Sequence, residues 1–323
     1  MPGSNFKSVG VNLFTRCPHN PIITTHILPY PANSIFNAGA AMVNNWTILL
    51  ARVEDMRGIS HLTVLRSRDG VTNWISDEFP SFSPDPEKFP EELWGVEDPR
   101  ITFLEDLKKF AICYTAYSRR GPQVSLAFTE DFRTFERKGV ILPPEDKNAS
   151  LFPCKFNDNY AVIHRPVAVG QDSNIWISFS TDLKRWGDHT MILECRRGAW
   201  WDSHRIGVCP PPLKTEKGWL VLYHGVRSTV SGQIYRLGIA LLDLNEPTKV
   251  LKRSDEWIFG PADPYELIGD VHNVVFPCGW ILEEESGRIR LYYGAADTSI
   301  GLATANIDEI FDYLETCPQP RQS

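Results

Sequence analysis

The segment of residues 95–100 combines residue types that could donate a proton. Its sequence, Gly-Val-Glu-Asp-Pro-Arg, places two acids side by side before a proline and an arginine. A residue that precedes proline is disfavoured in the α region, so we expect Asp98 to be held in an extended or turn conformation. A general acid must lie within hydrogen-bond reach of the atom that receives its proton, and a fixed backbone meets this requirement. Asp98 is therefore a candidate catalytic acid, the alternative being a solvated acid pair at a strand end.

Basic residues follow several segments that resemble strands. They are Arg52, Arg165, Arg205 and His224. Guanidinium groups that converge from different strands form a site for phosphate or carboxylate, whereas a single arginine is more often a surface or ion-pair residue. Aromatic residues in Gly- and Pro-containing loops, notably Trp94 and the pair at 200–201, could stack on a sugar ring or pack in the core.

Other kinds of chemistry lack their motifs. The chain has no G-x-S-x-G segment and no Gly-rich phosphate loop, so a serine nucleophile and a nucleotide site are not expected. The seven cysteines are far apart, without a C-x-x-C pair, and the cysteines and histidines do not have metal-ligand spacing. What remains is acid–base chemistry on a polar substrate, with no metal and no cofactor.

The composition limits the partners. The 323 residues are 42% hydrophobic and 23% charged, and the formal net charge is −7. No run of Lys and Arg exceeds two residues, so the basic face of a nucleic-acid-binding protein is missing. Residues 1–14 do not resemble a signal peptide, and no apolar stretch is long enough to span a membrane. We expect a soluble cytoplasmic protein with reduced thiols and no membrane contact.

A short unit repeats along the chain and predicts the elements that carry these residues. An apolar strand ends in a small hydroxyl residue, an acid two positions later and then an aromatic, with acids at Asp69, Asp131 and Asp182 and weaker copies ending at Asp243 and Asp308. The period of roughly 50 to 65 residues is that of a four-stranded propeller blade. Five copies predict five blades.

The segments between the repeats agree with this architecture. Each repeat is preceded by a β-branched or aromatic run; the five runs are residues 46–50, 110–114, 160–164, 219–223 and 289–293. Helical periodicity is best over residues 306–314. The predicted fold is all-β, a single five-bladed β-propeller catalytic domain over residues 1–323 with a short C-terminal helix. A propeller brings the ends of its inner strands together, so distant polar residues should converge near the axis.

Several motifs together resemble glycoside hydrolase family 130, the β-mannoside phosphorylases, over about residues 37–314. The segments that carry the resemblance are residues 95–100, 150–153 with 164–166, 205–207 with 210–212, 223–226, 235–238 and 293–297. Five-bladed propellers are the fold that the resemblance implies.

The resemblance also implies roles for individual residues. Asp98 matches the family's single catalytic acid, which passes its proton to the leaving oxygen through a hydroxyl of the mannosyl ring. The expected phosphate-binding residues are Arg165, Arg205, His224 and Tyr235, and the expected substrate-binding residues are Asn37, Arg52, Glu97, Asp202 and Asp297. Many relatives have lysine at the position of Arg205, which keeps the charge but not the forked geometry.

The implied activity is inverting phosphorolysis of a β-mannoside by inorganic phosphate, which yields α-mannose 1-phosphate. An inverting glycosidase needs a base that activates water, whereas phosphate is already an anion. A β-mannosidase of the same family and a non-catalytic sugar-binding propeller remain alternatives. The sequence leaves open the linkage (β-1,4 or β-1,2), the acceptor sugar, whose choice we assign to loops such as 79–93 and 262–273, and whether the protein is a homo-oligomer.

Overall fold

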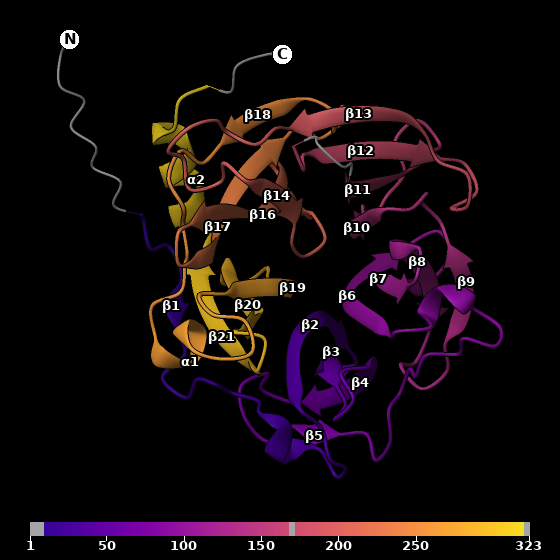
Figure 1. Cartoon of the computed structure of the whole chain (residues 1–323). Helices are drawn as coiled ribbons and strands as arrows, with labels where there is room; N and C mark the ends of the chain where they lie inside the picture. Colours follow the sequence, from indigo (N-terminus) through magenta and orange to yellow (C-terminus); the bar gives the residue numbers. More distant parts are fainter. Residues whose placement is uncertain (1–9, 168–171, 320–323) are drawn as a thin grey trace.

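The protein folds into five antiparallel sheets arranged around a common centre (Figure 1). The structure is a computed structural model and describes residues 10–167 and 172–319. Each sheet has four main strands, and the first strand of each sheet contacts strands of the neighbouring sheets around the centre. The five-bladed β-propeller predicted from the repeat is confirmed.

The first three blades are consecutive in the chain. Blade 1 comprises β2 (Ser34–Val43), β3 (Trp46–Glu54), β4 (Ser60–Ser67) and β5 (Ile75–Ser76). Blade 2 comprises β6 (Val96–Leu104), β7 (Lys109–Ser118), β8 (Gly121–Thr129) and β9 (Glu136–Val140). Blade 3 comprises β10 (Asp146–Leu151), β11 (Tyr160–Pro166), β12 (Ile175–Ser180) and β13 (Gly187–Leu193).

The last two blades include an extra strand and the closure of the ring. Blade 4 comprises β14 (Arg205–Val208), β15 (Leu213–Thr215), β16 (Gly218–Thr229), β17 (Gly232–Leu242) and β18 (Val250–Arg253). Blade 5 comprises β19 (Val275–Glu283), β20 (Arg288–Ala295), β21 (Ser299–Asn306) and, from the other end of the chain, β1 (Thr15–Arg16). The helical elements are η1 (Thr25–Ile27), η2 (Pro90–Glu92), α1 (Pro264–Leu267) and α2 (Ile307–Thr316).

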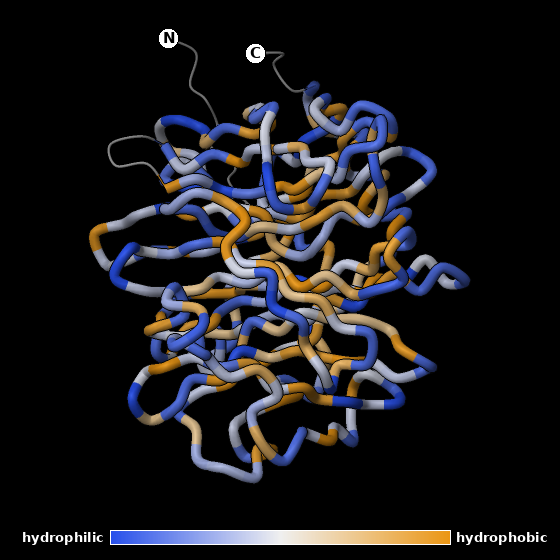
Figure 2. Tube along the Cα trace, turned by 90° about the vertical axis from the view of Figure 1, so that its right-hand side faces the viewer, coloured by the Kyte–Doolittle hydropathy of each residue, from blue (hydrophilic) through white to orange (hydrophobic). Residues whose placement is uncertain are grey.

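The hydrophobic core lies between and within the blades. Strands of adjacent blades share buried clusters, for example Leu50 of β3 with Ile112 of β7, and Phe152 after β10 with Trp219 of β16. Figure 2 shows hydrophobic stretches through the interior and hydrophilic stretches on most protruding loops. No helix within the described ranges is long and apolar enough to cross a membrane.

The repeated acids found in the sequence have a structural role. Asp69, Asp131, Asp182 and Asp243 each follow the third strand of a blade and accept two backbone N–H hydrogen bonds from the turn that leads to the fourth element. Such Asx turns explain the regular spacing. In blade 5 the same place is taken by Asn306, which caps α2 by accepting from the N–H of Asp308. The predicted C-terminal helix is thus confirmed.

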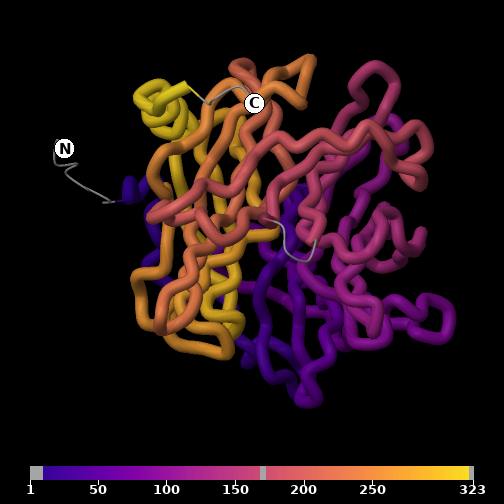
Figure 3. The backbone as a smooth tube through the Cα atoms, turned by 45° about the horizontal axis from the view of Figure 1, so that its top comes forward, coloured from indigo at the N-terminus to yellow at the C-terminus, as the bar shows by residue number. Residues whose placement is uncertain are grey.

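The direction of the strands defines the edge where the candidate residues lie. In every blade the first strand begins, and the second strand ends, at the same edge, because the two are antiparallel neighbours. Figure 3 shows the N-terminal segment beside the C-terminal blade, where β1 pairs with β21.

Candidate active site

Asp98 lies on the innermost strand of blade 2 in an irregular conformation. The register between β6 and β7 shifts between Glu97 and Arg100, and the φ angle of Asp98 is +50°. Of the two conformations expected for Asp98, extended or turn, the extended one is therefore wrong, because Asp98 occupies the left-handed region within a β-bulge. Its carboxylate is buried; Oδ1 accepts a hydrogen bond of 2.9 Å from the side-chain amide of Asn37 and lies 3.2 Å from Arg52.

The same bulge occurs in three consecutive blades. Asn37 of β2 has a φ of +46° and Asn148 of β10 a φ of +56°, each at a register shift equivalent to that at Asp98. The guanidinium of Arg100 lies between two of these residues, donating to the backbone carbonyl of Asp98 at 2.8 Å and to Oδ1 of Asn148 at 3.4 Å. The bulges thus bring three polar side chains from separate blades into one connected group.

A group of acids surrounds Arg52. Its guanidinium lies 3.1 Å from Glu97, 3.2 Å from Asp98 and 3.6 Å from Glu54. Burial raises the pKa of Asp98, but Arg52 and Arg100 outweigh this effect and hold it below its usual range. Burial, together with the charges of Asp98 and Glu97, raises the pKa of Asp297 to about 7 despite the opposing effect of Arg52. Asp297 is therefore partly protonated near pH 7, whereas Asp98 is ionised.

A basic group lies beside these acids. Lys147 of β10 lies opposite Arg165 of β11 in the sheet of blade 3. The equivalent pair in blade 2 is Glu97 and Thr115. Burial, reinforced by the charge of Arg205, lowers the pKa of Arg165 to about 10. Burial also lowers the pKa of Lys147. The charges of Glu97 and Asp98 oppose this effect, and the charge of Arg165 adds to it. These mutual effects show that the basic and acidic groups are neighbours.

Arg165 has no ion-pair partner within 4 Å among the residues the structure describes, although it is buried. Its Nε is also without a hydrogen-bond partner. A buried charge is costly unless it is paired. An anionic ligand would supply the missing partner.

Blade 4 completes the basic group. Arg205 of β14 donates to the side chains of Gln233 and Tyr235. The ring of His224 is buried between Tyr235 and Phe276, with ring centroids 5.9 Å and 4.8 Å away. Burial, together with Arg165 and Arg205, lowers the pKa of His224 well below its usual value. The imidazole is therefore neutral at pH 7 and can bind an anion through an N–H but not through a charge.

Sequence reasoning missed Lys147. The residue directly precedes the bulge of blade 3, as Glu97 does in blade 2 and Phe36 in blade 1. Aligning the blades on their bulges would have placed it opposite Arg165. The motif used for the family resemblance begins three residues later, so it did not include this position.

Asp202 lies apart from the expected substrate-binding residues. Its buried carboxylate lies 2.9 Å from Arg253 and 3.4 Å from Arg196, and accepts from the hydroxyl of Tyr223 at 3.3 Å. A Cβ on Gly225 would lie 2.4 Å from the Asp202 Cβ, so Asp202 packs under the strand residue that follows His224. These contacts use Oδ2 in ion pairs within blade 4, whereas Oδ1 is buried without a hydrogen-bond partner among the residues described, so the substrate-binding role of Asp202 stays a prediction.

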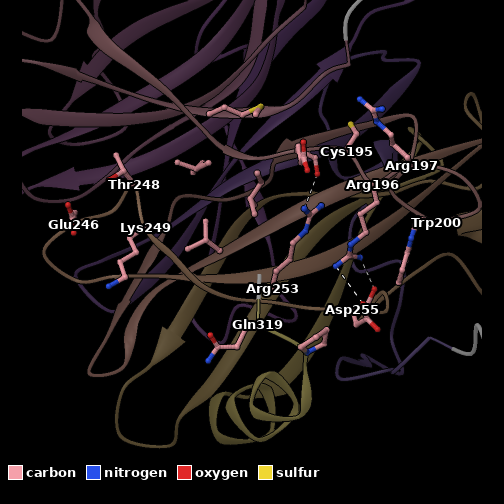
Figure 4. A pocket seen from close by; sticks show the side chains of 16 residues that line it. Cys195, Arg196, Arg197, Trp200, Glu246, Thr248, Lys249, Arg253, Asp255 and Gln319 are labelled. Carbon is pink, nitrogen blue, oxygen red and sulfur yellow. Dashed lines mark hydrogen bonds and ion pairs between the residues drawn. The ribbon is translucent and has the colours of Figure 1, made fainter. Parts of the chain in front are cut away.

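A large cavity lies on the side of the molecule rather than beside Asp98. It measures about 950 Å³ and is lined by residues that include Arg196, Arg253 and Trp200 (Figure 4). Two of its arginines are already engaged, since Arg253 donates to the carbonyl of Glu194 at 2.8 Å and Arg196 to that of Asp255 at 2.7 Å. The other cations in its lining, Arg197 and Lys249, are exposed, so among the residues described the cavity has no buried unpaired cation like Arg165.

The fold and the paired acidic and basic groups are those of a carbohydrate-active propeller, and the comparisons with known proteins specify which. Residues 15–316 match the model of glycoside hydrolase family 130, described as beta-1,4-mannooligosaccharide phosphorylase. The chain belongs to this family, as the motifs indicated.

Curated relatives and solved structures agree. A beta-1,4-mannooligosaccharide phosphorylase of Ruminococcus albus is 36% identical over 93% of this chain and 90% of its own length. A 1,2-beta-oligomannan phosphorylase of a Thermoanaerobacter species is 37% identical over 86% of this chain and 91% of its own. The structure of a beta-1,2-mannobiose phosphorylase from Listeria innocua superposes with a TM-score of 0.84 at 32% identity, covering 94% of this chain and 99% of that one.

Proposed function

We propose that this protein is an inverting phosphorylase that cleaves β-mannosides with inorganic phosphate and releases α-mannose 1-phosphate. The observation that carries the proposal is the buried Arg165, which has no carboxylate partner within residues 10–167 and 172–319, beside an acid held in a strained backbone conformation. Relatives that are 36% and 37% identical are named as phosphorylases acting on β-1,4- and β-1,2-linked mannosides, respectively. The reaction requires no cofactor beyond phosphate itself.

Phosphate binds to the basic group in this mechanism. Arg165, Arg205 and Lys147 supply charge, and His224 and the hydroxyl of Tyr235 supply neutral hydrogen bonds. Lys147 and Arg100 help to hold the pKa of Asp98 low in the free enzyme. A bound anion offsets their charges and thus raises the pKa of Asp98 towards the protonated form that a general acid needs.

The bond changes then balance without a base. An oxygen of phosphate attacks C1 of the mannosyl ring while the bond from C1 to the leaving oxygen breaks. Asp98 gives its proton to a mannosyl hydroxyl, which passes its own proton to the leaving oxygen. Asn37, Arg52, Glu97 and Asp297 hold the ring, and Asp98 returns to the carboxylate.

The hydrolase alternative needs a base that activates water across the ring from the acid. The carboxylates near Asp98, namely Glu54, Glu97 and Asp297, gather on the Arg52 side of the site. The cations Arg165, Arg205 and Lys147 lie on the other side, where the nearby carboxylate of Asp146 is bound to His164. This separation favours phosphate over water as the nucleophile, and the non-catalytic alternative leaves the bulged Asp98 without a role.

The linkage, the acceptor and the cytoplasmic location are expectations that belong to the same proposal. A screen in the synthetic direction tests it, with α-mannose 1-phosphate offered to mannose, glucose, N-acetylglucosamine and manno-oligosaccharides. We expect phosphate release with at least one acceptor, and the product's linkage to be β-1,4 or β-1,2. Failure to release phosphate with any acceptor, in a preparation that hydrolyses β-mannobiose, would favour the hydrolase.

A further inference from the structure

A row of hydrogen-bonded polar residues crosses blade 3 from its innermost to its outermost strand. Oδ2 of Asp146 in β10 lies 2.6 Å from Nδ1 of His164 in β11. Nε2 of His164 lies 2.7 Å from Oγ of Ser178 in β12, which lies 2.6 Å from Nδ1 of His189 in β13. Each strand of the blade contributes one member.

The hydrogen bonds of the row have one direction when both imidazoles are neutral. A carboxylate only accepts, so the Nδ1–H of His164 donates to Asp146. Its Nε2 must then accept from the hydroxyl of Ser178, and that oxygen accepts from the Nδ1–H of His189. Three members are buried and only His189 is exposed, so the row is anchored at the surface and ends beside the basic group.

The equivalent positions of blades 1 and 2 are apolar except for that of Tyr114, whose hydroxyl donates to Glu92. Aligned on the bulges, Asp146 corresponds to Ile35 and Val96, His164 to Ala51 and Tyr114, and Ser178 to Leu65 and Ala127. Burying polar groups where apolar side chains serve the same fold costs free energy. The fold of a blade therefore does not explain the row.

The row resembles a catalytic triad in its order of groups but cannot act as one. The hydroxyl of Ser178 is completely buried and is shared between two imidazoles. No substrate reaches it.

The members of the row alternate with the proposed phosphate ligands. Asp146 precedes Lys147, and His164 precedes Arg165, so each row member and its neighbour lie on opposite faces of the same strand. Asp146 is also the carboxylate with the largest effect on Arg165. Fixing Asp146 and His164 therefore fixes the two strands from which Lys147 and Arg165 extend.

We infer that Asp146, His164, Ser178 and His189 are positioning residues that hold Lys147 and Arg165 in the geometry that binds phosphate. The inference rests on the proposed function. It predicts that damage to the row weakens phosphate binding while mannoside binding and turnover at saturating phosphate stay close to native.

Ser178→Ala tests this directly because it breaks the row at its centre and leaves Asp98, Lys147 and Arg165 in place. We expect the phosphate KM to rise about fivefold, the equivalent of about 1 kcal/mol for one lost hydrogen bond. In the same assay, the mannoside KM and kcat should change by less than about twofold. Ser125→Ala is the matched control, since Ser125 is fully buried in the third strand of blade 2 and its hydroxyl has no hydrogen-bond partner.

His189→Ala keeps the test valid if Ser178→Ala does not fold, because His189 is exposed. It should raise the phosphate KM in the same direction by a smaller factor. A native phosphate KM in His189→Ala, or an equal rise in Ser125→Ala, would overturn the inference. A native enzyme whose rate does not depend on phosphate would instead contradict the proposed function, so the two failures are distinguishable.

Discussion

At the scale of single residues, the site separates two tasks between groups of opposite charge. Asp98 and its acidic neighbours face one guanidinium, that of Arg52, while Arg165 lacks a carboxylate partner among the residues described. The acidic group favours hydroxyl-rich ligands, whose O–H groups donate to carboxylates. The basic group favours an anion. A phosphorylase must hold both kinds of ligand at once.

The exchange Asp98→Asn tests the role of the acid. An amide keeps the hydrogen bond geometry around Asn37 and Arg52 but cannot donate the proton, so turnover should fall by about 10² to 10⁴. Circular dichroism and the melting temperature should show a native fold. A variant that keeps a tenth of native activity on an unactivated mannoside would remove Asp98 from the mechanism.

The raised pKa of Asp297 predicts a pH-dependent contribution to stability. The folded value of about 7 exceeds the ordinary value of 3.8, so this contribution is fully present below about pH 4 and is lost as the pH rises through 7. Each unit of difference corresponds to about 1.4 kcal/mol. Asp297→Asn cannot ionise and should gain stability over the native protein between pH 5 and about pH 8.

Urea unfolding of both proteins in phosphate-free buffer measures this difference. The gain should be larger at the alkaline end of the range. A difference that does not change with pH would mean that Asp297 ionises normally.

The sequence identified much of the site, and the misses have physical causes. Asn37, Arg52, Glu97 and Asp98 come together because bulges and strand ends converge, as a propeller requires. Lys147 was missed because its importance depends on the cross-strand register with Arg165. The ion pairs of Asp202 were not predicted, because an acid next to tryptophans gives no sign of the distant arginines that pair with it.

At the scale of elements, the β-bulges of the innermost strands determine which side chains reach the site. In a regular strand, side chains point alternately to the two faces of the sheet. The left-handed conformation of Asn37, Asp98 and Asn148, each on its own strand, changes the direction of the side chain. Such conformations cost free energy and persist where the surrounding structure enforces them. Their occurrence in three blades at the same place indicates a role in the site.

Gly294 of β20 leaves room for one of these side chains. A Cβ at this position would lie 2.0 Å from Oδ1 of Asn37, the residue whose amide donates to Asp98. Gly294→Ala should therefore displace Asn37 and reduce kcat at least as strongly as Asn37→Ala does. Gly187→Ala is the control, since a Cβ there has no atom within 4 Å. Steady-state kinetics decide: native kcat in Gly294→Ala would show that Asn37 need not contact Asp98.

The strand pattern was predictable where it repeats. The second strand of each blade, and the turn acid after the third, follow from β-branched runs and Asx turns that local chemistry determines. The bulges were not predicted, because no local residue pattern requires Asn37 or Asn148 to adopt a positive φ. They depend on the packing of the innermost strands against one another.

At the scale of the whole molecule, the ring is closed by a strand from the far end of the sequence. β1 pairs with β21, and Arg16 of β1 donates to Glu266 at 2.7 and 2.8 Å. Glu266 is fully buried and also accepts from the hydroxyl of Tyr293. The repeat predicted five blades but not this closure, because a strand of two residues leaves no periodic pattern.

Arg16→Ala tests the closing ion pair. Removing one partner of a buried pair leaves an uncompensated charge and typically costs about 3 to 5 kcal/mol. Arg57→Ala removes an exposed guanidinium that pairs with Asp55 and should cost about 0 to 1 kcal/mol. Free energies of unfolding from denaturant titrations compare the two. Equal losses would show that the closure contributes little to the stability of the ring.

The dependence of cleavage on phosphate tests the central claim most directly. β-1,4- and β-1,2-mannobiose are incubated with the protein in phosphate-free buffer and with added phosphate, and the products are resolved by NMR. The account predicts negligible cleavage without phosphate and α-mannose 1-phosphate with it, from at least one of the two disaccharides. Equal rates in both buffers, with free mannose as the product, would contradict it.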